Sequence, residues 1–263
     1  MKRIILIFAF LSVLAVSQLM GQRVHYILSQ GTNMSAQKFI PMSYDSVFAE
    51  DALRRVWDMD EHIVAAGFTY HGLQIVTSKY PGWGNQRYEF SHEYPKQFVE
   101  DMNAKGYTIT ELSTDGANWL AIATEVEEAP TQTFFEFDDP TTPEGRAEMD
   151  NVIKQMADEG AFITDVACGG NTWYAVATYD PDIVGQIYDF PVAAQDFSDF
   201  FMRNQTQGYR ISASDYGPGH YFCVMTKTKS RPKAQALLPG VEDPNSVMET
   251  FWKQQFAITK VGH

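Results

Sequence analysis

The residues that could perform catalysis are few, and they form no recognised motif. A nucleophilic enzyme needs a cysteine or serine beside a histidine and an acid, and the chain has no Gly-x-Ser-x-Gly elbow. Cys223 with His220 or His71 is the one combination that can be nominated. We therefore predict no catalytic residue from the sequence.

The histidines and clustered carboxylates do not predict a metal centre. His25, His220 and His263 fall near the point where the two chain ends are predicted to meet, but no pair of histidines has the local spacing of a zinc site. The acidic clusters match no calcium loop, and helix capping or solvation explains them. These acidic residues are Asp58, Asp60, Glu61, Asp138, Asp139, Asp180 and Asp182. We expect neither a metal nor a cofactor.

Three polar turns are the best candidates for a binding face. They carry polar side chains, and a large aromatic residue stands near the start of each strand that follows. In closed repeat rings such loops gather at one end. The aromatic residues could form a rim, although core packing is the favoured interpretation. The candidate binding residues are Asp115, Asn118, Trp119, Asn171, Trp173, Asp215, Tyr216, His220 and Tyr221.

Five glutamines in matching contexts indicate the elements that position these turns. Gln37, Gln86, Gln132, Gln186 and Gln235 are separated by 49, 46, 54 and 49 residues. Alternate apolar residues follow each glutamine, which is the period of a strand. Because buried amides need hydrogen-bond partners, we expect these side chains to satisfy backbone groups at the junctions between units. A central polar pocket lined by the five amides is the alternative.

A helix and two further strands are predicted after each glutamine strand. Apolar residues recur at helical spacing, beginning with Val47, Phe48 and Val56 in the first unit. Three helices end at Gly106, Gly160 and Gly208, where a left-handed cap is expected. The next strand carries an isoleucine followed by a small hydroxyl or β-branched residue in every unit. These isoleucines are Ile63, Ile109, Ile163, Ile211 and Ile258.

The two chain ends hold complementary halves of one unit. Residues 25–29 match the last strand of a unit but lack the isoleucine strand before it. Residues 256–261 match the isoleucine strand but lack the strand that should follow it. Complementary halves are what a closed ring needs, whereas an open array has capped ends. The sequence therefore predicts one α/β domain over residues 22–263. In it, five strand-strand-strand-helix units close into a propeller-like ring, and the N-terminal strand completes the last unit.

Residues 73–90, continuing through 94–95 to 106–110, resemble a repeat domain of unknown function that follows the kinase domain in plant casein-kinase-like protein kinases. The likeness spans roughly residues 63–226, and Gly-Tyr-x-Ile-Thr/Ser at 106–110 and 208–212 is its clearest mark. The third unit departs from this pattern, and the first unit lacks the glycine and tyrosine. The chain contains no kinase catalytic loop. The resemblance implies a noncatalytic accessory or recognition module, here in a stand-alone exported version.

The composition and the first residues predict an exported protein. Residues 1–21 have the charge, apolar core and small-residue order of a secretory signal peptide, and the apolar run is too short to span a membrane. The remaining chain has 18 basic against 33 acidic residues, a formal charge of −15. This charge disfavours binding to nucleic acid or to anionic membranes. We expect Cys168 and Cys223 to be separate buried thiols, with a disulfide as the alternative.

These observations predict a periplasmic or secreted module that binds or scaffolds an envelope or extracellular protein or glycan through its loop face. The alternative is a hydrolase with a site at the centre of the ring. Ionisable side chains clustered at the centre would favour the enzyme, and an apolar, plugged centre would favour the binding module.

Overall fold

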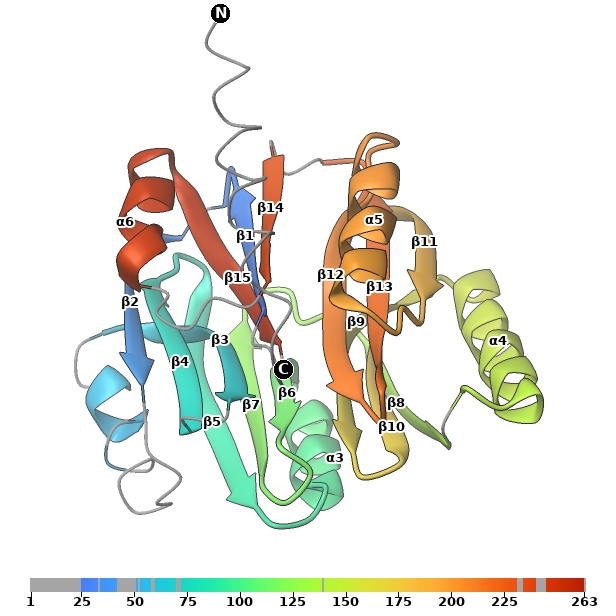
Figure 1. The fold of residues 1–263 in the computed structure, drawn as a ribbon. Coiled ribbons are helices and arrows are strands. Elements are labelled where there is room, and N and C mark those ends of the chain that lie inside the picture. Colours follow the sequence, from blue (N-terminus) through green and yellow to red (C-terminus); the bar gives the residue numbers. More distant parts are fainter. Residues whose placement is uncertain are drawn as a thin grey trace, which may run out of the picture.

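The computed structural model describes residues 25–32, 34–41, 51, 53–57, 60–69, 72–138, 140–230, 234–239 and 245–262. The predicted signal peptide lies outside these residues, as do Val47, Phe48, His71 and His263. The described chain is mostly β and forms five three-stranded antiparallel sheets (Figure 1). A helical segment lies between two of the strands in each sheet.

The five sheets have the same internal order. A strand that carries the repeated glutamine lies on one side, a middle strand in the centre, and a strand that carries the repeated isoleucine on the other side. The Gln strands are β2 (Ser35–Pro41), β5 (Trp83–Ser91), β8 (Gln132–Asp138), β11 (Ile183–Asp189) and β14 (Ala234–Pro239). The Ile strands are β3 (His62–Thr69), β6 (Tyr107–Thr114), β9 (Ala161–Gly169), β12 (Arg210–Gly217) and β15 (Phe256–Gly262). The middle strands are β4 (Gly72–Lys79), β7 (Trp119–Val126), β10 (Thr172–Tyr179), β13 (His220–Thr228) and β1 (His25–Gln30).

Each helix connects a Gln strand to an Ile strand, as the sequence predicts. The helices are α3 (Lys96–Ala104), α4 (Pro143–Asp158), α5 (Ala194–Gln205) and α6 (Asn245–Lys253), and residues 53–57 are also helical. Buried residues are spaced by three or four along them, as in Met149 and Ile153 of α4. Thr142 caps α4 by accepting a hydrogen bond from the Gly145 amide at 3.1 Å. The helices therefore bury one face and expose the other.

The fifth sheet is assembled from both ends of the chain. The N-terminal strand β1 lies between β14 and β15 and pairs with both in antiparallel fashion. Ile27, for example, lies opposite Leu237 on one side and Lys260 on the other. The prediction that the N-terminal strand completes the last unit is confirmed.

The repeated glutamines join neighbouring units. In the second unit, Gln86 accepts a hydrogen bond from the Ile63 amide at 2.8 Å and donates one to the Ile63 carbonyl at 3.0 Å. The same two bonds join Gln132 to Ile109, Gln186 to Ile163, Gln235 to Ile211 and Gln37 to Ile258. The prediction that each amide satisfies backbone groups at a junction is confirmed, and each of the five amides is bonded at a separate junction.

The small residue after each isoleucine is a β-bulge. In every sheet the register between the Ile strand and the middle strand shifts at this position, so that the residue has no partner across the ladder. The three bulged threonines contact hydroxyl groups of the middle strand. Thr110 and Thr164 contact Thr124 and Thr178 at 2.7 Å, and Thr259 contacts Ser29 at 3.0 Å. The bulged residues are Val64, Thr110, Thr164, Ser212 and Thr259.

The hydrophobic core of the described residues lies between the sheets. It consists of five clusters, each shared by two neighbouring sheets. One cluster joins Ile75 of the first sheet to Leu120 and Ile122 of the second, and another joins Ile258 of the fifth sheet to Val76 of the first. The Ile strands contact one another in the order β3, β6, β9, β12 and β15, and β15 also contacts β3. The buried apolar surface of each unit is therefore covered by the next unit, so the units stabilise one another.

All five units use a left-handed residue to leave the helix. The position three residues before the repeated isoleucine has a positive φ in every unit, and the glycine caps predicted at Gly106, Gly160 and Gly208 are confirmed by φ values of 81°, 86° and 93°. In the first unit Asp60 takes this position with φ 56°, and in the fifth Gln255 takes it with φ 63°. The first unit therefore keeps the turn although it lacks the glycine.

Replacing Gly160 by alanine isolates the energy of this turn. A Cβ added at Gly160 would meet nothing within 4 Å, so the change tests the backbone conformation alone. We expect Gly160→Ala to lower the free energy of unfolding by about 1 to 2 kcal/mol, because a left-handed φ is strained for alanine. Gly160→Asn is the matched control and should cost less, since asparagine tolerates this conformation. Urea denaturation measures both; equal losses would contradict the explanation.

The two cysteines are separate and buried, as predicted. Cys168 lies in β9 and Cys223 in β13, and neither is bridged. Within the described part of the chain, no helix is long and apolar enough to cross a membrane.

Candidate functional site

The structure divides the predicted binding residues into a buried and an exposed group. Trp119, Trp173, Asp215, His220 and Tyr221 are each at most 7% exposed, so they belong to the interior. The interpretation of the three aromatic residues as a rim is wrong, and the favoured prediction of core packing is confirmed. The partly or fully exposed residues are Asp115, Asn118, Asn171 and Tyr216.

The two buried tryptophans pack against glycines of the following unit. A Cβ added at Gly169 would lie 2.2 Å from the Trp119 ring, and one added at Gly217 would lie 2.4 Å from the Trp173 ring. Both distances are far below van der Waals contact, so these positions must be glycine for the rings to fit. The tryptophans therefore fix one unit on the next beneath the hairpin turns.

Asp115, Asn118 and Asn171 lie in the hairpin turns that follow the Ile strands. Tyr216 lies in β12, where its ring packs against that of Tyr221. In the turn after β6, the Asp115 carboxylate accepts hydrogen bonds from the amides of Ala117 and Asn118 at 2.9 and 2.7 Å. A Cβ on Gly116 would lie 3.9 Å from the Gly170 amide nitrogen, so the turns of the second and third units are adjacent. We call these turns, at residues 115–118, 170–171 and 218–219, the hairpin end of the molecule.

A buried ionic cluster lies where three Ile strands meet. The Lys260 ammonium of β15 donates to the Glu111 carboxylate of β6 at 2.8 Å and also to the Asp165 carboxylate of β9. Lys260 is 8% exposed and the two carboxylates are 3% exposed. All three residues occupy the same place in the repeat, two positions after the isoleucine.

The carboxylates of this region also bind the backbone of the preceding unit. Glu111 accepts from the Ala66 amide at 3.2 Å, and Asp165 accepts from the Leu112 amide at 2.7 Å. Asp215 accepts from the Cys168 amide at 2.9 Å. The cluster thus has the ionisable groups of a reaction centre, but its oxygens are already used in joining β3, β6, β9 and β12.

Burial changes the protonation of these groups. It raises the pKa of Glu111 to about 8, although the nearby Lys260 ammonium acts in the opposite direction. It also raises the pKa of Asp215 to about 7, against the hydrogen bonds from the Cys168 and Tyr216 amides. Burial alone would lower the pKa of Lys260, but the two neighbouring carboxylates outweigh it and raise this pKa. One ammonium cannot neutralise two carboxylates, so a carboxyl group here retains its proton to unusually high pH.

The raised pKa of Asp215 predicts that the protein loses stability as the pH rises. The folded state binds this proton more tightly than the unfolded state, so the stabilisation is complete below the unfolded pKa near 4 and is lost as the pH rises through about 7. We expect the free energy of unfolding to fall by up to about 1.4 kcal/mol per pH unit in this window. Asp215→Asn should reduce the slope of the free energy of unfolding against pH. Urea denaturation between about pH 5 and 8 measures this slope, since the range covers most of the interval between the unfolded and folded pKa values of Asp215.

The exposed Asp138 provides the control for this experiment. Asp138→Asn makes the same chemical change at an exposed position, so it should alter the free energy of unfolding by no more than about 0.5 kcal/mol. An unchanged slope in Asp215→Asn would show that Asp215 is not the responsible group.

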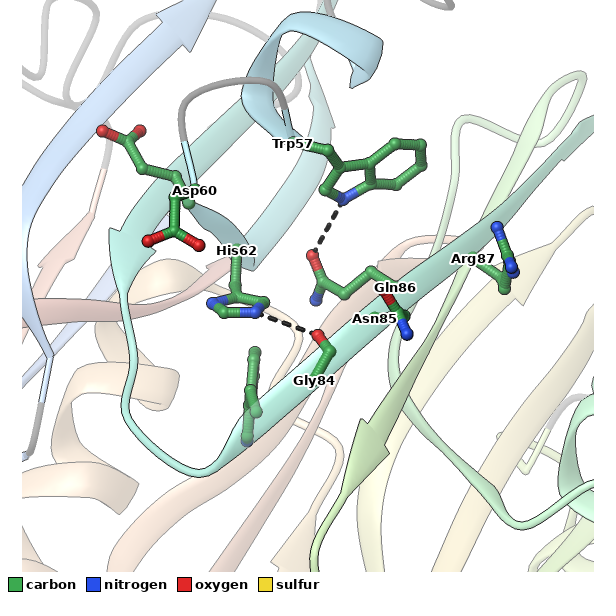
Figure 2. A pocket seen from close by; sticks show the side chains of 9 residues that line it. Trp57, Asp60, His62, Gly84, Asn85, Gln86 and Arg87 are labelled. Atoms are coloured by element: carbon green, nitrogen blue, oxygen red, sulfur yellow. Dashed lines mark hydrogen bonds between the residues drawn. The ribbon is translucent and has the colours of Figure 1, made fainter.

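A pocket lies at the junction of the first and second units (Figure 2). It has a volume of about 420 Å³ and is formed by the end of the helical segment 53–57, the start of β3 and the start of β5. Trp57 donates from its indole nitrogen to Gln86, and His62 Nε2 lies 3.0 Å from the Gly84 carbonyl oxygen (Figure 2). The lining residues are Trp57, Asp60, Glu61, His62, Trp83, Gly84, Asn85, Gln86 and Arg87.

Sequence reasoning missed both the ionic cluster and the pocket. Opposite charges at one repeat position, in Glu111, Asp165 and Lys260, were a signal that could have revealed the cluster. The described residues contain no group of three or more histidine, cysteine, aspartate or glutamate side chains that could hold a metal ion. His220, the partner suggested for Cys223, lies against the Trp173 and Phe190 rings.

Comparison with known proteins adds no family to this description. No protein-family model matches the chain, and no curated protein matches it.

Proposed function

We propose that the five units close into a ring, an α/β propeller, and that the ring is an exported binding module that holds a partner protein at its hairpin end. The closure is supported by the contacts of β15 with both β12 and β3 and by the bonds of Gln37 to Ile258. Export rests on the predicted signal peptide of residues 1–21.

The observation that carries this proposal is the rigidity beneath the hairpin end. The Trp119 and Trp173 rings lie against Gly169 and Gly217 of the next unit, so adjacent turns are held in one arrangement. Asn171 and other exposed polar side chains stand on this base. A preorganised polar surface loses little conformational entropy on binding, which favours recognition of a folded partner.

Capture of partners from crosslinked envelope tests this function. The mature chain should retain a reproducible protein, and Ala117→Arg with Asn171→Arg should release it, because both residues are exposed in the turns of the hairpin end and these changes leave the core untouched. Asn151→Arg, at an exposed position of α4, is the matched control and should retain the partner. Equal capture by all three proteins would overturn the proposal.

A hydrolase with its site at the ionic cluster is the second candidate. The cluster of Lys260, Glu111 and Asp165 favours it, because perturbed ionisable groups gather at active sites. Two observations weigh against it: these side chains are buried, and they are hydrogen-bonded to one another and to the backbone. Hydrolysis in a substrate screen that disappears in Glu111→Gln, while the protein stays folded, would establish the enzyme.

A further inference from the structure

We propose that the pocket between the first and second units binds a neutral saccharide. This site is separate from the hairpin end, because His62 is the first residue of β3 and the turns follow the last residues of the Ile strands. Four properties support the proposal: the composition of the junction, its aromatic rings, its hydrogen-bonding groups and its charge.

The other junctions show that the fold does not require most of these side chains. Six positions of a junction are compared. Three lie six, three and one residues before the isoleucine, and at the first junction they hold Trp57, Asp60 and His62. The other three lie three and one residues before the glutamine and one residue after it, and they hold Trp83, Asn85 and Arg87. At the second junction the same positions hold Asn103, Gly106, Thr108, Ala129, Thr131 and Thr133. At the third they hold Ala157, Gly160, Phe162, Ile183, Gly185 and Ile187. These three junctions share only the glutamine and the isoleucine. At the fifth junction Trp252 takes the position of Trp57 and donates to Gln37 in the same way, so this tryptophan also serves the framework. The other five residues of the first junction recur at no other junction, which indicates that they serve another purpose.

The aromatic rings offer flat, partly exposed surfaces. Both Trp57 and Trp83 are half-buried. The Trp57 ring is supported by Tyr88 at 5.3 Å, and the Trp83 ring by Tyr80 at 4.7 Å. Rings held in place in this way pay little entropy when they pack against the apolar face of a sugar.

The polar groups include both donors and acceptors that are free to bind. Within the described residues, the side chains of Asp60 and Arg87 make no hydrogen bond or ion pair, and both are exposed. The contact of His62 Nε2 with the Gly84 carbonyl places the proton on Nε2 and leaves Nδ1 as an acceptor. No described residue satisfies this buried Nδ1. Hydroxyl groups, which donate and accept, match this mixed set better than purely anionic or cationic ligands.

The charges of the pocket nearly cancel. The Glu61 carboxylate is paired with the Lys38 ammonium and accepts from the Thr77 hydroxyl at 2.7 Å. Asp60 and Arg87 remain, with one charge of each sign. A volume of about 420 Å³ falls within the range of roughly 300 to 1,000 Å³ for small-ligand sites. A neutral, hydroxyl-rich ligand of one or two rings therefore fits.

Saturation-transfer NMR with the mature chain tests the proposal. The probes are cellobiose, maltose and N,N′-diacetylchitobiose at millimolar concentration, with glucuronate as the acidic comparison. We expect signals from at least one neutral disaccharide. Arg87→Ala and Trp83→Ala should each weaken its affinity about tenfold or more, because each removes one side of the pocket.

The controls separate binding from folding and from the hairpin end. Arg203→Ala, at an exposed arginine of α5, should bind like the unmodified protein, and Asn171→Arg should also keep saccharide binding. If Trp83→Ala fails to fold, the exposed Asp60→Asn and Arg87→Ala provide the test. The proposal is overturned if no neutral disaccharide binds, if only glucuronate binds, or if folded Arg87→Ala binds with unchanged affinity.

Discussion

Lys260→Met should lower the free energy of unfolding by about 3 to 5 kcal/mol at pH 8, because it leaves two buried carboxylates without their cation. Glu111 and Asp165 are 3% exposed and cannot recover solvation without opening the core. The loss should shrink at pH 5, where the carboxyl groups take up protons in the folded state. Urea denaturation followed by tryptophan fluorescence measures the loss at both pH values.

Two further variants make this prediction specific to charge. Adding Glu111→Gln and Asp165→Asn to Lys260→Met should restore more than half of the loss, since the amides need no cation. Lys229→Met, at an exposed lysine, should change the stability by no more than about 0.5 kcal/mol. A loss that is the same at pH 5 and pH 8 would mean that Lys260 acts through packing of its methylene chain.

Gln132→Leu should lower the free energy of unfolding by about 2 to 4 kcal/mol, because it leaves the Ile109 amide and carbonyl buried without partners. Gln132 accepts from this amide at 2.7 Å and donates to the carbonyl at 3.1 Å. Leucine fills a similar volume, so the change removes the hydrogen bonds and leaves little cavity. Thermal and urea denaturation of the variant give the loss.

Gln186→Leu provides the matched control, since Gln186 makes the same two bonds to Ile163 but is only half-buried. Water can replace its amide, so we expect a loss of about 1 kcal/mol or less. Equal losses at the two positions would contradict the argument from burial.

The repeat was predictable because certain positions in every unit need one particular side chain or backbone conformation. A buried amide that bonds both backbone groups of an isoleucine cannot easily be replaced, so Gln37 and its equivalents recur in recognisable contexts. The glycine caps recur because a left-handed turn is needed in each unit. The order of strands and helices follows from these marks and from apolar periodicity.

The packing beneath the hairpin end, the ionic cluster and the pocket were less predictable, because each of them depends on contacts between units. Gly169 and Gly217 lie at the ends of β9 and β12, and their lack of a Cβ makes room for Trp119 and Trp173. Lys260 lies in a strand near the C-terminus, and only the arrangement of β15 beside the other Ile strands brings it to Glu111. The pocket unites residues near 57–62 with residues near 83–87 and has no continuous pattern in the chain.

The pairing of β1 with β15 makes the order of synthesis matter. Gln30 lies opposite Phe256, so the first described strand must wait for the last one before its sheet is complete. Contacts so distant in the chain form late in folding. A chain that stops before β15 would leave the edge of β1 open to proteases or aggregation. The fifth sheet therefore acts as a check that the chain has been made as far as β15 before the domain becomes resistant to unfolding.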